Sequence, residues 1–180
     1  MKNKYEARLG TERMLPLVFK MALPAVAAQF VNLLYNIVDR IYIGHIPEIG
    51  TNALAGIGVT TSIVILISSF SAIVGAGGSP LAAIALGQGD RERAGKIVGN
   101  GFILLILFTI FTSLITYTFM EPILLFTGAS ENTLSYARDY LSIYLLGTLF
   151  VELSTGLNTF INIQGRPTVS MYAVLTGAIL

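Results

Sequence analysis

The chain has 180 residues, of which 54% are hydrophobic and only 12% are charged, and its mean hydropathy is +0.74. Soluble domains usually carry about 25% charged residues, so this composition indicates that lipid surrounds much of the protein. The chain has no cysteine and one histidine, which excludes a disulfide framework, thiolate chemistry and a histidine-rich metal centre. We therefore expect a membrane protein that is not an enzyme.

Long windows without charge predict several membrane-spanning helices. Asp, Glu, Lys and Arg are absent from residues 21–38, 49–89 and 97–120, and a helix needs about 20 mostly apolar residues to cross the hydrocarbon core. After a polar amino-terminal arm (1–13), a transmembrane domain is expected over residues 14–180. Its helices are expected at about 15–43, 53–87, 91–119, 132–163 and 168–180.

Individual residues refine these expected helices in chain order. Pro24 lies inside the first helix and predicts a kink there, because proline removes a backbone donor. The cluster Gly75–Gly78 and Pro80 predict a break in the second helix, which PLAAIALGQ then continues as a bent cytoplasmic extension. Asp90 is expected to cap the amino terminus of the third helix, and EPILLFTGA predicts a short segment at the membrane interface.

The last expected helix is short. Thirteen residues from Thr168 to Leu180 extend about 20 Å, against a hydrocarbon core of about 30 Å. This length predicts a truncated helix and a chain that is the front part of a longer protein.

The basic residues predict the orientation. Only Arg40 and Arg138 fall on one side of the alternating topology. The other nine fall on the opposite side: Lys2, Lys4, Arg8, Arg13, Lys20, Arg91, Arg93, Lys96 and Arg166. Because Lys and Arg accumulate on the cytoplasmic side of membrane proteins, the amino terminus is expected to be cytoplasmic.

A polar stripe follows one face of the first helix. Four residues share about 80° of the helical wheel: Gln29, Asn32, Asn36 and Asp39. Polar side chains that faced lipid would lack partners, so this face, together with Tyr35, is expected to line the bundle interior or a water-filled cavity. The alternative is that Asp39 and Arg40 only mark the helix end and reach toward the interface.

A second polar stripe follows the fourth helix. Its members on the wheel are Thr148, Glu152, Thr155, Thr159 and Asn162. A charged Glu152 near mid-span costs at least ~2.5 kcal/mol. It could line a cavity, where it would take a proton or attract a cationic substrate, with Thr155, Asn158 and Thr159 lining the same cavity. Alternatively, a neutral Glu152 is hydrogen-bonded to a neighbouring helix.

Small residues in the second helix predict close helix–helix packing. They are Gly56, Gly58, Ser62, Ser68, Ser69, Ser71 and Ala72.

Several motifs together resemble the multidrug and toxic compound extrusion (MATE) family of transporters. They are Pro24 with LYNIVDRIYIG in the first helix, GTNALAGIG opening the second, GAGGSPLAAIALGQGDRERAGK around the following loop, and QGRPTVSM entering the fifth. The resemblance covers nearly the whole chain in matching order. It departs from the family at Asn162, where relatives often carry Arg, and it includes no counterpart of Glu152.

The resemblance implies an all-α transporter of twelve helices in two lobes, of which this chain is an incomplete N-terminal lobe with about five transmembrane helices. It implies an antiporter in the prokaryotic plasma membrane that exports small cationic or amphipathic organic substrates in exchange for protons or sodium. Asp39, with Asn36, is implied to bind the coupling cation, and Pro24 to act as the conformational hinge.

The same resemblance implies what the protein contacts. A sodium ion at Asp39 would be the one metal, and no cofactor or nucleic acid is expected. The expected partners are membrane lipid and the remainder of the transporter, including an Asn and an Asp beyond Leu180.

Two other functions remain compatible with these residues. One is a lipid-linked saccharide flippase of the same superfamily, although a cavity for anionic headgroups should carry Arg and Lys rather than Asp39 and Glu152. The other is a membrane scaffold subunit, in which the polar stripes only hold helices together.

Overall fold

The computed structural model describes residues 14–179, so the expected amino-terminal arm lies outside the described residues. These residues form six α-helices and no strand: α2 (Met14–Gly44), α3 (Gly50–Gly87), α4 (Arg91–Thr118), α5 (Met120–Phe126), α6 (Glu131–Ile163) and α7 (Pro167–Ile179). Four helices are long and apolar enough to cross a membrane, namely α2 from Ala22, α3, α4 and α6. The prediction of an all-helical, polytopic membrane protein is confirmed.

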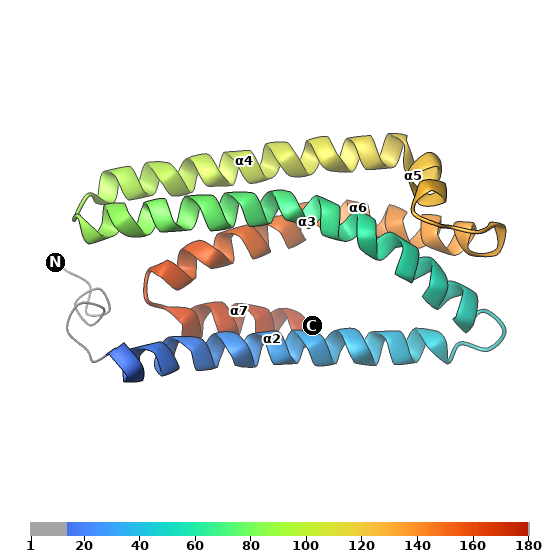
Figure 1. Cartoon of the computed structure of the whole chain (residues 1–180), viewed down its shortest axis with the longest axis horizontal. Coiled ribbons are helices and arrows are strands. Elements are labelled where there is room, and N and C mark those ends of the chain that lie inside the picture. The colour runs from blue at the N-terminus through green and yellow to red at the C-terminus, as the bar shows by residue number, and fades with distance from the viewer. Residues whose placement is uncertain (1–13, 180) are drawn as a thin grey trace.

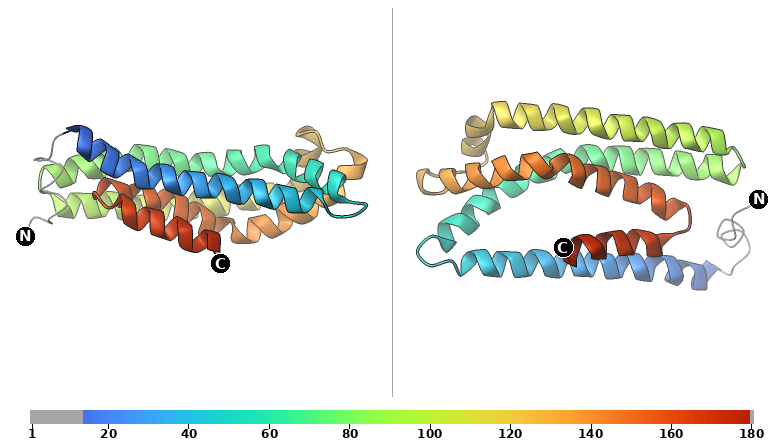
Figure 2. Two further views of the ribbon diagram at one scale, coloured as in Figure 1. Left: turned by 90° about the horizontal axis from the view of Figure 1, so that it is seen from below. Right: turned by 180° about the vertical axis from the view of Figure 1, so that it is seen from behind.

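The helices form two groups (Figure 1). In the first group, α3 packs extensively on both α6 and α4, and α4 also contacts α6. In the second group, α7 lies beside α2. Helix α2 packs more extensively on α7 than on any other described helix. The α2–α3 loop and α5 lie at one end of the molecule, and the α3–α4 and α6–α7 turns lie at the other (Figures 1 and 2).

Helix α3 is uninterrupted, so the predicted break at Gly75–Gly78 and Pro80 is wrong. The glycines instead allow a close approach of α6. A Cβ atom at Gly75 would lie 2.9 Å from Thr159 Oγ1, and one at Gly78 would lie 2.8 Å from the ring of Phe160. The visible change of direction in α3 lies in its teal first half (Figure 1). Helix α2 is likewise continuous through Pro24.

The turn between α3 and α4 follows local chemistry. The side chain of Asp90 accepts a hydrogen bond from the backbone N–H of Arg93 at 2.9 Å, which confirms Asp90 as the N-cap. Gly89 precedes it with φ +83°, a conformation that residues with a side chain rarely adopt. Together these residues end one membrane helix and start the next within three positions.

The contact between α3 and α6 generates the first prediction. A Cβ atom at Gly56 would lie 3.0 Å from the backbone nitrogen of Ala137 and 3.2 Å from the backbone oxygen of Thr133. Since backbone atoms cannot rotate away, Gly56→Ala forces α3 and α6 apart and should cost about 1–3 kcal/mol of stability. The measurement is the thermal unfolding midpoint of the protein in detergent.

The matched control is Gly58→Ala, because no atom lies within 4 Å of a Cβ placed there. Alanine favours a helix over glycine by about 0.5–1 kcal/mol, so this variant should unfold at the same temperature or higher. Equal midpoints for the two variants would contradict the close contact.

Candidate functional site

The centre of α6 carries a carboxyl group that is enclosed by α3. Glu152 is 1% exposed and Thr148, one turn before it, is 0% exposed. Glu152 Oε1 accepts a hydrogen bond from Ser68 Oγ at 2.7 Å, and Oε2 forms a short hydrogen bond with Ser71 Oγ. Both carboxyl oxygens therefore have a partner on the neighbouring helix, as a buried polar group requires.

The sequence of α3 explains why these serines meet Glu152. Residues three apart share a helix face, so Ser68 and Ser71 point to the same side of α3. Ser69 points elsewhere and donates to its own backbone, at Ile65 O, 2.8 Å away. Gly75 continues the serine face and contacts Thr159 of α6. A small, polar face of α3 thus lies against Glu152 and Thr159 of α6.

The other predicted residues of α6 occupy different environments. Thr148 and Thr159 donate hydrogen bonds to their own helix, at Tyr144 O (2.9 Å) and Gly156 O (2.7 Å). Thr155 is exposed. Asn158 Oδ1 is buried without a hydrogen-bond partner in the described part of the chain, as is Asn162 Oδ1. The lining of a cavity by Glu152, Thr155, Asn158 and Thr159 stays a prediction.

The polar stripe of α2 is uncovered in this chain. All five of its predicted residues are exposed: Gln29, Asn32, Tyr35, Asn36 and Asp39. Asn36 Nδ2 donates to Asn32 O at 2.8 Å and lies 3.3 Å from Asn32 Oδ1. The amide of Asn36 is therefore engaged with Asn32, one turn earlier, rather than with Asp39, and cation binding by Asp39 and Asn36 stays a prediction.

Two tyrosines of α6 each have a carboxyl group among their electrostatic neighbours. The rings of Tyr140 and Tyr144 are stacked, with centroids 6.2 Å apart and planes inclined by 17°. The electrostatic neighbours of the Tyr140 hydroxyl include Asp39, Arg40 and Tyr35, whereas those of the Tyr144 hydroxyl include Glu152 and Ser68.

These tyrosines are not among the residues predicted from the sequence, although a signal for them is present. Residues 140, 144, 148 and 152 recur every four positions, so the tyrosines extend the Thr148–Glu152 face by two turns. Ser68 and Ser71 were predicted as packing residues only, because spacing within one helix does not reveal a polar partner on another helix.

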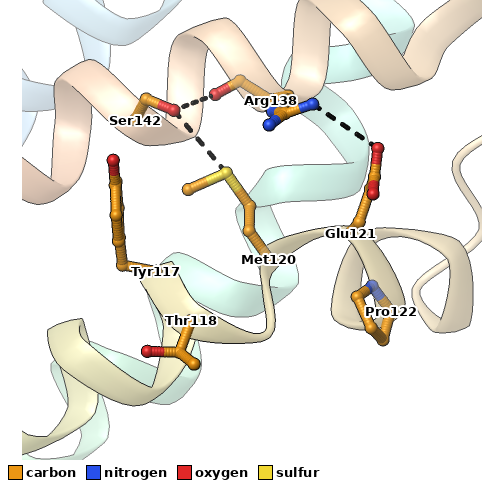
Figure 3. Close-up of a pocket in the computed structure, with 7 residues that line it drawn as sticks. All are labelled: Tyr117, Thr118, Met120, Glu121, Pro122, Arg138 and Ser142. Carbon is orange, nitrogen blue, oxygen red and sulfur yellow. Dashed lines mark hydrogen bonds and ion pairs between the residues drawn. The ribbon is translucent and has the colours of Figure 1, made fainter.

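A second polar cluster lies where α4, α5 and α6 meet (Figure 3). Arg138 Nη1 is 3.5 Å from Glu121 Oε1, and both side chains are more than half exposed. Ser142 Oγ donates to Arg138 O at 2.7 Å, beside a pocket of about 290 Å³. An exposed ion pair contributes only about 0–1 kcal/mol, so this cluster positions α5 rather than forming a buried charged site.

Residues 14–179 contain no group of three or more His, Cys, Asp or Glu side chains that could hold a metal ion. The two predicted carboxyl groups of α2 and α6 differ in their surroundings, because Asp39 is exposed and Glu152 is buried.

Comparison with known proteins shows similarity to membrane exporters. The chain is 26% identical to the multidrug export protein MepA of Staphylococcus haemolyticus over 86% of its length. It is 29% identical to the FAD transporter of Shewanella oneidensis over 77% of its length. It is 28% identical to the probable multidrug resistance protein NorM of Pseudomonas putida over 91% of its length.

These matches cover 34%, 30% and 34% of the respective relatives, so the chain spans about a third of their length. No solved structure gives a significant match. The MatE family profile matches residues 24–180, which include every predicted site residue. The predicted family is confirmed: this chain belongs to the MatE family of MATE transporters.

Proposed function

We propose that this chain is part of a secondary active transporter that exports organic cations or drugs in exchange for protons or sodium. The observation that carries the proposal is the uncovered polar face of α2, which ends at Asp39. This face runs along a helix that is otherwise apolar and long enough to span a membrane.

The cost of burying polar groups in lipid supports this proposal. Ionisable groups within membrane helices almost always face a protein interior or a water-filled path. No described helix buries Gln29, Asn32, Asn36 or Asp39, so further parts of the protein or water must meet them. A water-accessible polar face inside a membrane protein is what a transport path requires.

Coupling would arise from unequal affinity of Asp39 for its cation in two conformations. A ligand shifts a conformational equilibrium only by the difference in its binding free energy between the two states. A single carboxylate can hold either a proton or, with further oxygen ligands, a sodium ion. Asn32 and Asn36 place such amide oxygens on the same face of α2.

The distribution of basic residues supports an amino terminus on the cytoplasmic side. The first two turns of α4 carry Arg91, Arg93 and Lys96, and the α6–α7 turn carries Arg166, at the same end of the molecule (Figure 1). Cytoplasmic loops are enriched in such residues. For a family with bacterial relatives, this distribution supports a location in the inner membrane.

The relatives bear on the substrate class. Two are named for multidrug export or resistance, and one for FAD, which carries negative phosphates. The acidic groups Asp39 and Glu152 favour an organic cation as cargo. Uptake assays in inverted membrane vesicles with a cationic dye and with FAD separate the two classes.

Neutralising the carboxylate of α2 provides the main test. Asp39→Asn keeps the size of the side chain but cannot be protonated or bind sodium as an anion, so efflux of a cationic dye from cells should fall to background. Membrane levels should be unchanged, because Asp39 is exposed and supports no packing within the described residues. Retained efflux would exclude Asp39 as the coupling group.

The matched control is Asp90→Asn, which also removes one carboxylate. Asn caps a helix about as well as Asp, so the hydrogen bond from Arg93 N and normal efflux should both be preserved.

The second test concerns Pro24. Alanine at this position restores the missing backbone donor and stiffens α2, so Pro24→Ala should lower the maximal efflux rate and leave the apparent substrate affinity unchanged. The control is Pro80→Ala. Pro80 lies in α3, which packs on both α4 and α6, so this variant should transport normally. Equal rates for Pro24→Ala and wild type would refute the hinge.

A further inference from the structure

The surroundings of the buried Glu152 carboxyl group on α6 differ from those of the exposed Asp39. Glu152 is 1% exposed, and Ser68 and Ser71 of α3 meet its two oxygens. We propose that Glu152, Ser68 and Ser71 form a second proton-binding site, located between α3 and α6. Its role in ion coupling rests on the proposed transport function, whereas the binding of a proton does not.

The position of Ser71 suits both protonation states of the carboxyl group. Ser71 Oγ contacts Glu152 Oε2 and also lies 3.4 Å from the backbone oxygen of Glu152. When the carboxyl is ionised, the Ser71 hydroxyl donates to Oε2. When Oε2 carries a proton, the acid donates to Ser71 Oγ and the serine hydrogen turns to the backbone oxygen, because a hydroxyl can donate once and accept twice.

Ser68 makes the same hydrogen bond in both protonation states of Glu152. Its hydroxyl donates to Oε1 at 2.7 Å, and this oxygen can accept in either protonation state. No group of the site is left without a partner when the proton arrives or leaves. A carboxyl group that only fastened two helices would need a single protonation state and a single set of hydrogen bonds.

The surrounding helices carry few charges that could fix the state of Glu152. Helix α3 has no titratable residue, and α4 has none between Ile97 and Thr116. The titratable group of α7 within the described range is Tyr172, and the one near Glu152 on α6 is Tyr144.

The basic residue of α6 itself lies well before Glu152. Arg138 is fourteen positions earlier, or about 21 Å along the helix. Among the described residues Glu152 has hydrogen bonds to Ser68 and Ser71 and no ion pair, so a negative charge on it would be stabilised by these two hydroxyls alone.

In the transporter, loss of this proton would leave a charge at the α3–α6 contact and weaken it. Protonation of Glu152 would therefore favour the conformation described here, and each transport cycle could exchange a proton at Glu152 in addition to the cation at Asp39. Differential affinity for the proton in two conformations is the physical requirement for such coupling.

Infrared spectroscopy of the purified full-length protein tests the site directly. The C=O band of protonated carboxyl groups should decrease as pH rises. The part of this decrease that is absent from the Glu152→Gln variant is the Glu152 component. The same component should be lost when Glu152→Gln is added to Asp39→Asn, since the two sites are separate. Glutamine can still accept from Ser68 and donate to Ser71, so this variant should fold.

Two serine variants refine the test and do not alter the carboxyl itself. Ser68→Ala removes the hydrogen bond to Oε1, so the C=O frequency of the Glu152 component should shift. Ser69→Ala is the matched control, because Ser69 is exposed and bonds to its own backbone, and it should leave the component unchanged.

The outcomes separate this site from the transport proposal. A Glu152 component that does not change with pH, or none at all, would overturn the site as a proton-binding site even if efflux is normal. A component that titrates as expected in a protein without efflux would retain the site and reject the transport function.

Discussion

The close contact between α3 and α6 supports the rest of the described structure. Gly56 brings α3 against the backbone of α6 near Ala137, and Gly75 brings it against the side chain of Thr159. Between these points, Ser68 and Ser71 bond to Glu152. Membrane helices gain little from hydrophobic burial against each other, so close packing and interhelical hydrogen bonds must hold them together. This contact provides both.

The other helices depend on that contact to different degrees. Helix α4 packs against the pair, with Leu105 so near Gly156 that a Cβ there would lie 2.6 Å from it. Helix α2 packs mainly on α7, and its polar face stays exposed. The described chain therefore combines a tightly packed unit with a helix whose functional face needs further partners.

The two carboxyl groups in the membrane helices illustrate the consequence. Glu152 has its hydrogen-bond partners within the chain and is nearly inaccessible, so its charge depends on the packing of α3 on α6. Asp39 is exposed, so its environment depends on water or on protein beyond the described residues. A protonation change at one group alters internal packing, whereas a change at the other alters contacts with what lies outside.

The sequence by itself determined the all-helical membrane fold, the N-cap at Asp90 and the family, because hydropathy, charge and capping are local properties. It also placed Glu152 on a polar face of α6 by its helical spacing. Only the tertiary structure decided that Ser68 and Ser71 meet Glu152 and that Gly75 and Gly78 face Thr159 and Phe160 of α6. The physical reason is that each depends on contacts between helices, and spacing within one helix contains no information about its neighbour.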